Sequence, residues 1–190
     1  DNWYQSSAYF CSSFALITSV NEEGVTSIGP YQLSFPFGVI HRREWIVISR
    51  KNSNTTNNLK RIKKCAMNFV EYDKRFVPNI VDLGYPGQEP EEKMKDCLFE
   101  LEESPTESYR QDPERPKVIK NAFQVFECNL NDNPEDFFYK GNEYTDYLLL
   151  EIQKIYLREQ WRKNLDLGDK TKIPNMPISY GFRNTNQFWF

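Results

Sequence analysis

Residues 44–70 read EWIVISRKNSNTTNNLKRIKKCAMNFV, and this stretch decides the fold. It opens with an apolar run rich in β-branched residues, which is typical of a strand. In the polar run that follows, Ser53 or Asn54 can cap a helix that continues to Ile62, and the cations near its end suit the helix dipole. A second apolar run ends at Val70. The stretch therefore predicts a strand, a helix and a strand, in that order.

Further strands are predicted on both sides of this stretch. The apolar runs 14–20 and 25–35 are separated by the turn signal at 21–24, which favours a hairpin. The runs 122–130 and 144–157 are also interpreted as strands, the second of them by its length and context. Many short strands with only one well-defined early helix favour a mainly β, antiparallel barrel, and a chain of 190 residues suits a single domain.

Two segments lack this strand pattern. Residues 72–117 combine six prolines with many charges, which predicts an irregular insertion with one short helix near 91–102. The tail 173–190 is rich in aromatic residues without a clear period, which indicates packing against something, a partner subunit being one candidate.

Composition excludes several classes of protein. With 39% hydrophobic and 15% aromatic residues, the chain is not disordered overall. A net charge of −3 gives no basic footprint for nucleic acid, and no apolar run is long enough to span a membrane. The first residues lack the basic and apolar regions of a signal peptide, so we expect a cytoplasmic protein. The usual glycine-rich dinucleotide and P-loop motifs are absent from the sequence.

Cysteine and histidine usage argues against a metal site. No Cys-x-x-Cys pair occurs, so neither a zinc ribbon nor a thioredoxin-type redox centre is predicted, and reduced, mostly buried thiols are expected. His41 is the only histidine and lies beside two arginines in a turn-like segment, which gives no catalytic assignment. The four cysteines are Cys11, Cys65, Cys97 and Cys128.

The step from strand to helix at 46–59 is the strongest chemical feature of the sequence. Exposed N–H groups and the positive dipole end at a helix start attract anions such as phosphate. Arg50 can add a charge-assisted contact, and Ser53, Thr55 and Asn58 can add short hydrogen-bonding side chains. Ordinary capping and solvated surface roles for the same residues are the alternative.

Short motifs along the chain point to a known family. Residues 54–59, NTTNNL, have the form of an Asp-Thr-x-x-Asn-Ile segment, and 126–128, FEC, that of a Leu-Glu-Cys strand. In their order and spacing, such segments resemble those of the flavin reductase-like, FMN-binding split-barrel proteins, which include flavin reductases and flavoredoxin. The segments that carry this resemblance are 16–20 with Gly24, 27–32, 54–59, 63–68, 126–128 and 149–152.

The resemblance implies a Greek-key split barrel and a homodimer with FMN near the subunit interface. It also implies that the FMN phosphate lies at the strand end and helix start, and that the ring and ribityl chain follow the second strand, mostly against its backbone. The cofactor-binding residues that it implies are Ser27, Gly29, Pro30, Tyr31, Gln32, Leu33, Ser34, Ser49, Arg50, Ser53, Thr55 and Asn58.

Three functions are compatible with this resemblance. The first is an FMN-dependent oxidoreductase that takes a hydride from NADH or NADPH, as a flavin reductase does. The second is a flavoredoxin-like electron carrier that works with a redox protein partner, and the third is an FMN- or ligand-binding module without turnover. Many reductases have a histidine near the nicotinamide, whereas this chain has Tyr144 or Thr145 there, and the insertion at 72–117 can cover the ring face.

Overall fold

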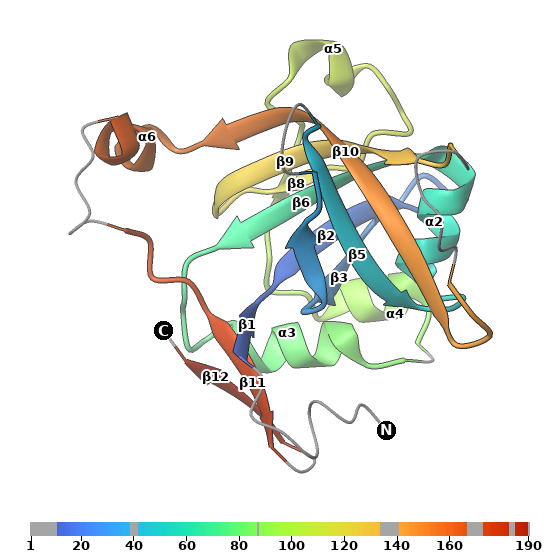
Figure 1. Cartoon of the computed structure of the whole chain (residues 1–190), viewed down its shortest axis with the longest axis horizontal. Coiled ribbons are helices and arrows are strands. Elements are labelled where there is room, and N and C mark those ends of the chain that lie inside the picture. The colour runs from blue at the N-terminus through green and yellow to red at the C-terminus, as the bar shows by residue number, and fades with distance from the viewer. Residues whose placement is uncertain are drawn as a thin grey trace.

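A curled, seven-stranded antiparallel sheet forms the body of the protein (Figure 1). The computed structural model describes residues 11–38, 42–86, 88–133, 141–166, 173–182 and 185–189. Across the sheet, the strands are β3 (Thr26–Tyr31), β2 (Ala15–Val20), β6 (Lys64–Val70), β9 (Ala122–Asn131), β10 (Thr145–Leu157), β5 (Glu44–Arg50) and β4 (Ser34–Pro36).

The two edge strands of this sheet are consecutive in the chain. Only Gln32 and Leu33 separate β3 at one edge from β4 at the other. The backbone N–H of Ile48 on β5 donates to the carbonyl oxygen of Leu33 at 2.8 Å, which fastens this connection to the far edge. A sheet whose edges are joined in this way must curl. The expected mainly β, antiparallel barrel is confirmed.

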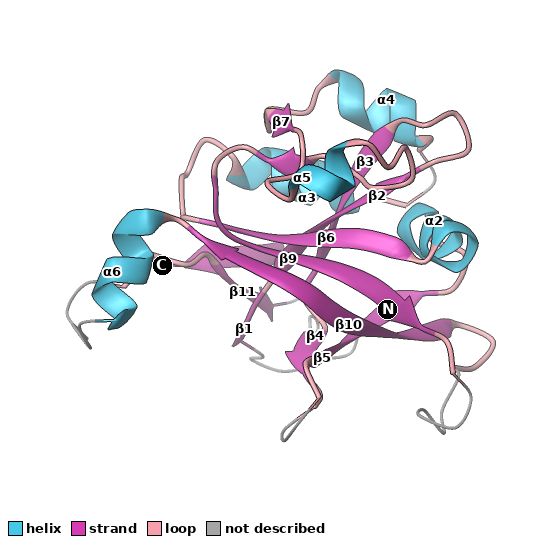
Figure 2. Ribbon diagram, turned by 90° about the horizontal axis from the view of Figure 1, so that it is seen from above, coloured by secondary structure: helices cyan, strands magenta, loops and turns pink. Residues whose placement is uncertain are grey.

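The helices and two smaller sheets surround this body. Figure 2 shows α3, α4 and α5, with β7, on one side of the large sheet, and α6 beyond the end of β10. The helices are α2 (Asn54–Ile62), α3 (Val77–Gly84), α4 (Pro90–Lys95), α5 (Glu107–Arg110) and α6 (Glu159–Asp166). The smaller sheets are β7 (Leu101–Glu102) with β8 (Val118–Ile119), and β1 (Cys11–Ser13) with β11 (Ile178–Phe182) and β12 (Thr185–Trp189).

Helix α2 forms where the sequence predicts it. The Ser53 hydroxyl accepts from the backbone N–H of Thr56, and the helix ends at Lys63, which has a left-handed φ of 59°. Leu59 and Ile62 are buried against the sheet, and Lys60 and Arg61 occupy the last turn. The cap, the apolar face and the cations at the C-terminal end therefore all agree with one short helix.

The central strand β6 is buried on both faces. Cys65 and Met67 belong to the cluster inside the barrel, whereas Ala66 and Val70 belong to a second cluster shared with the insertion. Asn68 is fully buried, donates to the carbonyl oxygen of Leu16 at 2.9 Å and accepts from the N–H of Ile119 at 2.9 Å. Burial of both faces explains why this strand is an almost continuous apolar run in the sequence.

The insertion is more ordered than its composition suggests. It contains α3, α4, α5 and the β7–β8 pair, and the helix expected at 91–102 ends at Lys95. That part of the expectation is wrong, because Phe99 stacks on Phe76 with ring centroids 4.8 Å apart and Leu101 pairs with Ile119. Strands β11 and β12 occupy the tail, whose aromatic side chains from position 180 onward lie outside the described residues.

Candidate functional site

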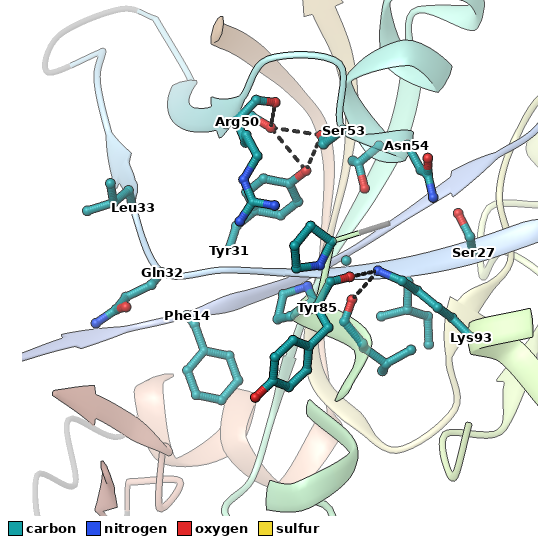
Figure 3. Close-up of a pocket in the computed structure, with 18 of the residues that line it drawn as sticks. Phe14, Ser27, Tyr31, Gln32, Leu33, Arg50, Ser53, Asn54, Tyr85 and Lys93 are labelled. Carbon is teal, nitrogen blue, oxygen red and sulfur yellow. Dashed lines mark hydrogen bonds between the residues drawn. The ribbon is translucent and has the colours of Figure 1, made fainter. Parts of the chain in front are cut away.

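A cleft of about 900 Å³ runs along β3 (Figure 3). One wall is β3 itself, the second is the end of β5 with the start of α2, and the third is the insertion from α3 to α4. The residues that line the cleft include Phe14, Ser27, Gly29, Pro30, Tyr31, Gln32, Leu33, Ser49, Arg50, Lys51, Ser53, Asn54, Thr55, Gly84, Tyr85, Lys93, Tyr144 and Thr145.

Four hydroxyl groups meet at the start of α2. Tyr31 Oη lies 3.2 Å from Ser49 Oγ and 3.1 Å from Ser53 Oγ, and the two serine oxygens are 3.0 Å apart. The Thr56 hydroxyl completes the group and donates to Ser49 Oγ at 2.7 Å. Hydroxyl groups rotate to donate or to accept, so this cluster can adapt to an anion at the helix start.

The charged side chains that line the cleft are all cations. Arg50, Lys51 and Lys93 line it, and none of its described lining residues is an aspartate or a glutamate. The Arg50 side chain makes no hydrogen bond or ion pair with the described part of the chain, whereas Lys51 Nζ donates to the carbonyl oxygen of Asn142 at 2.9 Å. An unneutralised positive cleft attracts anionic ligands.

Lys93 comes from the insertion, opposite the start of α2. Its Nζ donates to the carbonyl oxygen of Leu83 at 3.2 Å and to that of Tyr85, which fixes the side chain against the end of α3. Burial lowers the pKa of Lys93 below its ordinary value, and the nearby charge of Arg50 lowers it further. A ligand with negative charge would relieve this repulsion between two cations of the same cleft.

The backbone of β3 forms a smooth wall because it carries Gly29 and Pro30. A Cβ atom at position 29 would lie 2.7 Å from Thr55 Oγ1 and 3.1 Å from Tyr31 Cε2. Likewise, a Cβ atom at Gly84 of α3 would lie 3.2 Å from the ring of Pro30. The close approach of α2 to this strand therefore leaves no room for a side chain at position 29 without a shift of Thr55, and the contact at position 84 is tight.

Side-chain hydrogen bonds hold the insertion to the barrel beside the cleft. Asn21, in the turn between β2 and β3, donates through Nδ2 to Glu91 Oε1 of α4. Asn54, at the start of α2, donates to the carbonyl oxygen of Gln88 at 3.2 Å. The third wall of the cleft is thus fastened at two points to the elements that form the other walls.

The structure brings most of the predicted site residues together. All of them except Ser34 and Asn58 line the cleft. Ser34 is buried and donates to the carbonyl oxygen of Tyr31 at 3.3 Å, while Asn58 is buried and donates to Ser19 Oγ at 3.0 Å. Both of these side chains serve the packing of the elements around the cleft.

The sequence indicated that the insertion can cover the ring face, but it marked no residue of the insertion as part of the site. Lys93 and Tyr85 line the cleft, but no motif marked them, because short proline-bounded helices carry little periodic signal. Thr145 and the exposed Tyr144 lie at the cleft, and the sequence resemblance places them where many flavin reductases have a histidine. His41 lies outside the described residues.

The described ranges contain neither a candidate metal site nor a helix that could cross a membrane. No group of three or more histidine, cysteine, aspartate or glutamate residues there is arranged to hold a metal ion. Likewise, none of the helices described has the length and apolar character that crossing a bilayer requires.

Solved structures share this architecture over almost the whole chain. A Shewanella frigidimarina protein assigned as a flavin reductase with a split barrel domain superposes with a TM-score of 0.70 at 11% identity, covering 95% of this chain and 83% of its own. The fold is the split barrel. Flavoredoxin from Methanosarcina acetivorans matches this split barrel with a TM-score of 0.68 at 15% identity, covering 94% of this chain and 84% of its own.

A third similar split barrel is a 2-nitrobenzoate 2-nitroreductase from Pseudomonas fluorescens. Its TM-score is 0.66 at 18% identity, and the match covers 93% of this chain and 80% of that one. No protein-family model matches the sequence, and no curated protein is significantly similar to it in sequence. At these identities the structural likeness shows the fold, so the function must be argued from the cleft itself.

Proposed function

We propose that the cleft binds FMN and that the protein is an oxidoreductase of the flavin reductase type. The observation that carries the proposal is a cleft whose described lining has three cations and no carboxylate. This cleft adjoins the start of α2 and the glycine–proline backbone of β3. A terminal phosphate suits the cationic end, and a flat ring system suits the backbone wall. The flavins suggested by the names of two similar split barrels agree with this chemistry.

Each wall has a distinct task in this proposal. Arg50 and Lys93 neutralise the phosphate, and the hydroxyls of Ser53 and Tyr31 donate to its oxygens. Gly29 keeps the β3 backbone accessible to the ring, because any side chain there would displace Thr55. A bound flavin supplies the redox chemistry, while the protein binds it, orients it and controls access to it.

An electron carrier without a nicotinamide site is the second candidate function. The insertion favours it, because α3, α4 and the exposed Tyr85 occupy one whole side of the cleft. This wall narrows the room for a second, bulky substrate over a bound ring. The two functions differ in whether a nicotinamide can reach the cofactor.

One spectroscopic experiment tests both functions. The protein is mixed with FMN and desalted, and its visible spectrum is recorded before and after anaerobic addition of NADH and then NADPH. A retained flavin band that bleaches with either nicotinamide supports the reductase. A band that bleaches only with dithionite supports the electron carrier. Loss of all flavin on desalting, together with no binding in a titration, would refute the proposed cofactor.

A pair of variants tests the cationic end of the cleft. Lys93→Met removes a charge that lines the cleft, whereas Lys95→Met removes an exposed charge from the same helix that does not line it. We expect Lys93→Met to weaken FMN binding about tenfold or more, as for loss of a hydrogen bond to a charged group, and Lys95→Met to leave it unchanged. Equal effects of the two substitutions would refute this assignment of Lys93.

A homodimer is also part of the proposal. Ile155 near the end of β10 is 51% exposed, and Leu165 on α6 and Ile173 are 72% and 69% exposed. Exposed apolar side chains that form a patch are typical of an interface with a partner, and we propose that these three belong to one. Ile155 pairs with Phe126 of β9, and α6, which carries Leu165, lies beyond the end of β10 (Figure 1).

A further inference from the structure

Asp146 is a buried carboxylate with only one of its two oxygen atoms paired. Its residue is 5% exposed, and Oδ1 forms an ion pair with Lys60 Nζ at 2.9 Å. Oδ2 is buried and has no hydrogen-bond partner among the described residues. Such a group contributes little to the free energy of unfolding, because the cost of removing the carboxylate from water offsets one ion pair with a half-exposed lysine. Its presence at this buried position therefore calls for an explanation other than stability.

The position of this ion pair connects it to the anion end of the cleft. Asp146 on β10 is the direct cross-strand partner of Ser49 on β5. Directly opposed residues of an antiparallel pair project from the same face of the sheet. Ser49 belongs to the hydroxyl cluster, so the carboxylate lies on the face that carries this cluster.

Helix α2 contacts both members of this cross-strand pair. Thr56 donates to Ser49 Oγ at 2.7 Å, and Lys60, one helical turn later, reaches Asp146. Residues four apart share one side of a helix. The helix is therefore attached to β5 and β10 at two points along a single side, and two points fix its direction as well as its position.

We propose that Asp146 is a positioning residue of the anion site: through Lys60 it sets the direction of α2, and so places Ser53, Asn54 and Thr55 against Arg50. Without the Lys60 contact, α2 stays attached to β2 through Asn58 and Arg61 and to β5 through Thr56, but it loses its attachment to β10, so the helix can tilt about its contacts with β2. The backbone N–H groups at its start would then no longer converge with the Arg50 side chain on one anion. This inference rests on the proposed function, since it concerns the phosphate end of the FMN site.

The test compares FMN with riboflavin, which lacks the phosphate. The affinities of both are measured by quenching of flavin fluorescence for the full chain and for Asp146→Asn, which keeps the side-chain shape and removes the charge. We expect Asp146→Asn to weaken FMN binding about tenfold and to leave riboflavin binding unchanged. A purely structural role would change both affinities equally, or only the melting temperature.

Asp132→Asn is the matched control. Asp132 forms an ion pair with Lys63 at the other end of α2 at 3.0 Å, but both side chains are exposed, and neither contacts the hydroxyl cluster. The ratio of FMN to riboflavin affinity should stay at the parental value in this variant. If Asp146→Asn does not fold, Lys60→Met provides the same test from the half-exposed partner, and Lys60→Arg should restore the parental ratio.

The outcomes separate this inference from the proposed function. A parent that binds FMN no more tightly than riboflavin would refute the phosphate site, and this inference with it. A parent that prefers FMN, with the same preference in Asp146→Asn and Lys60→Met, would refute the positioning role alone. A preference reduced in both variants, and kept in Asp132→Asn, supports it.

Discussion

Replacing Gly29 by alanine probes the contact between β3 and α2 at the centre of the cleft. The new Cβ atom would lie 2.7 Å from Thr55 Oγ1, and ordinary contacts begin near 3.4 Å, so one of the two atoms must move by about 0.7 Å. Overpacking of this kind costs roughly 1–3 kcal/mol, and the stiffer unfolded chain returns roughly 0.5–1 kcal/mol. We expect a net loss of about 1–2 kcal/mol in the free energy of unfolding.

The effect on FMN binding follows from the same displacement. Moving the Thr55 hydroxyl away from the helix start removes one hydrogen bond to a charged ligand, which is worth roughly 1.5–3 kcal/mol. This corresponds to a loss of FMN affinity of about 10- to 100-fold. Urea unfolding measures the stability of the variant, and a fluorescence titration measures its affinity for FMN.

A double-mutant cycle tests the reasoning behind both numbers. Thr55→Ala removes the oxygen atom that the new methyl group meets, and the Thr55 Cβ atom lies 3.8 Å away, an ordinary contact. Gly29→Ala should therefore cost about 1 kcal/mol less in the Thr55→Ala background than in the parent. Strictly additive effects of the two substitutions on unfolding would refute the proposed clash between position 29 and Thr55.

Other expected outcomes concern the remainder of the molecule. Leu165→Glu should convert a homodimer to a monomer in light scattering, and a parent that is already monomeric would contradict the proposed interface. Asn68→Ala should lower the free energy of unfolding in urea by about 3 kcal/mol, since it leaves the buried Ile119 N–H unpaired. Burial raises the pKa of Asp112, but hydrogen bonds from Lys64 and the Glu114 N–H outweigh it and lower the pKa overall. This contribution to stability is complete above about pH 4 and is lost as the pH falls through the lowered pKa, and Lys64→Met should reduce that dependence in unfolding measured from pH 6 to pH 3.

The sequence predicted the parts of the fold that are determined locally. In α2 and β6, the preference of the local sequence agrees with the structure that the whole fold requires. Examples are the cap at Ser53, the apolar positions of α2 and the apolar run of β6, which is buried on both faces. The same local pattern predicted an anion site at the helix start, which stays a prediction. The long run of β10 was also assigned correctly as a strand.

The parts that were missed depend on contacts between distant residues. Lys93 enters the cleft because α4 is held by Asn21, and this hydrogen bond joins residues 70 positions apart. Asn58 looked like part of a polar helix start, but its helical position turns it toward Ser19 of β2. Neither fact has a local signature, because each depends on which strand or helix lies beside the residue in the folded chain.

The continuity of β3 and β4 has a consequence for the energetics of the molecule. The segment 26–36 lines the cleft with its first half and reaches the far edge of the sheet with its second. A ligand that binds only the folded form stabilises every element whose opening would release that segment. Occupancy of the cleft should therefore slow amide exchange in residues 45–47 of β5, which pair with β4 and do not line the cleft, as well as beside the ligand.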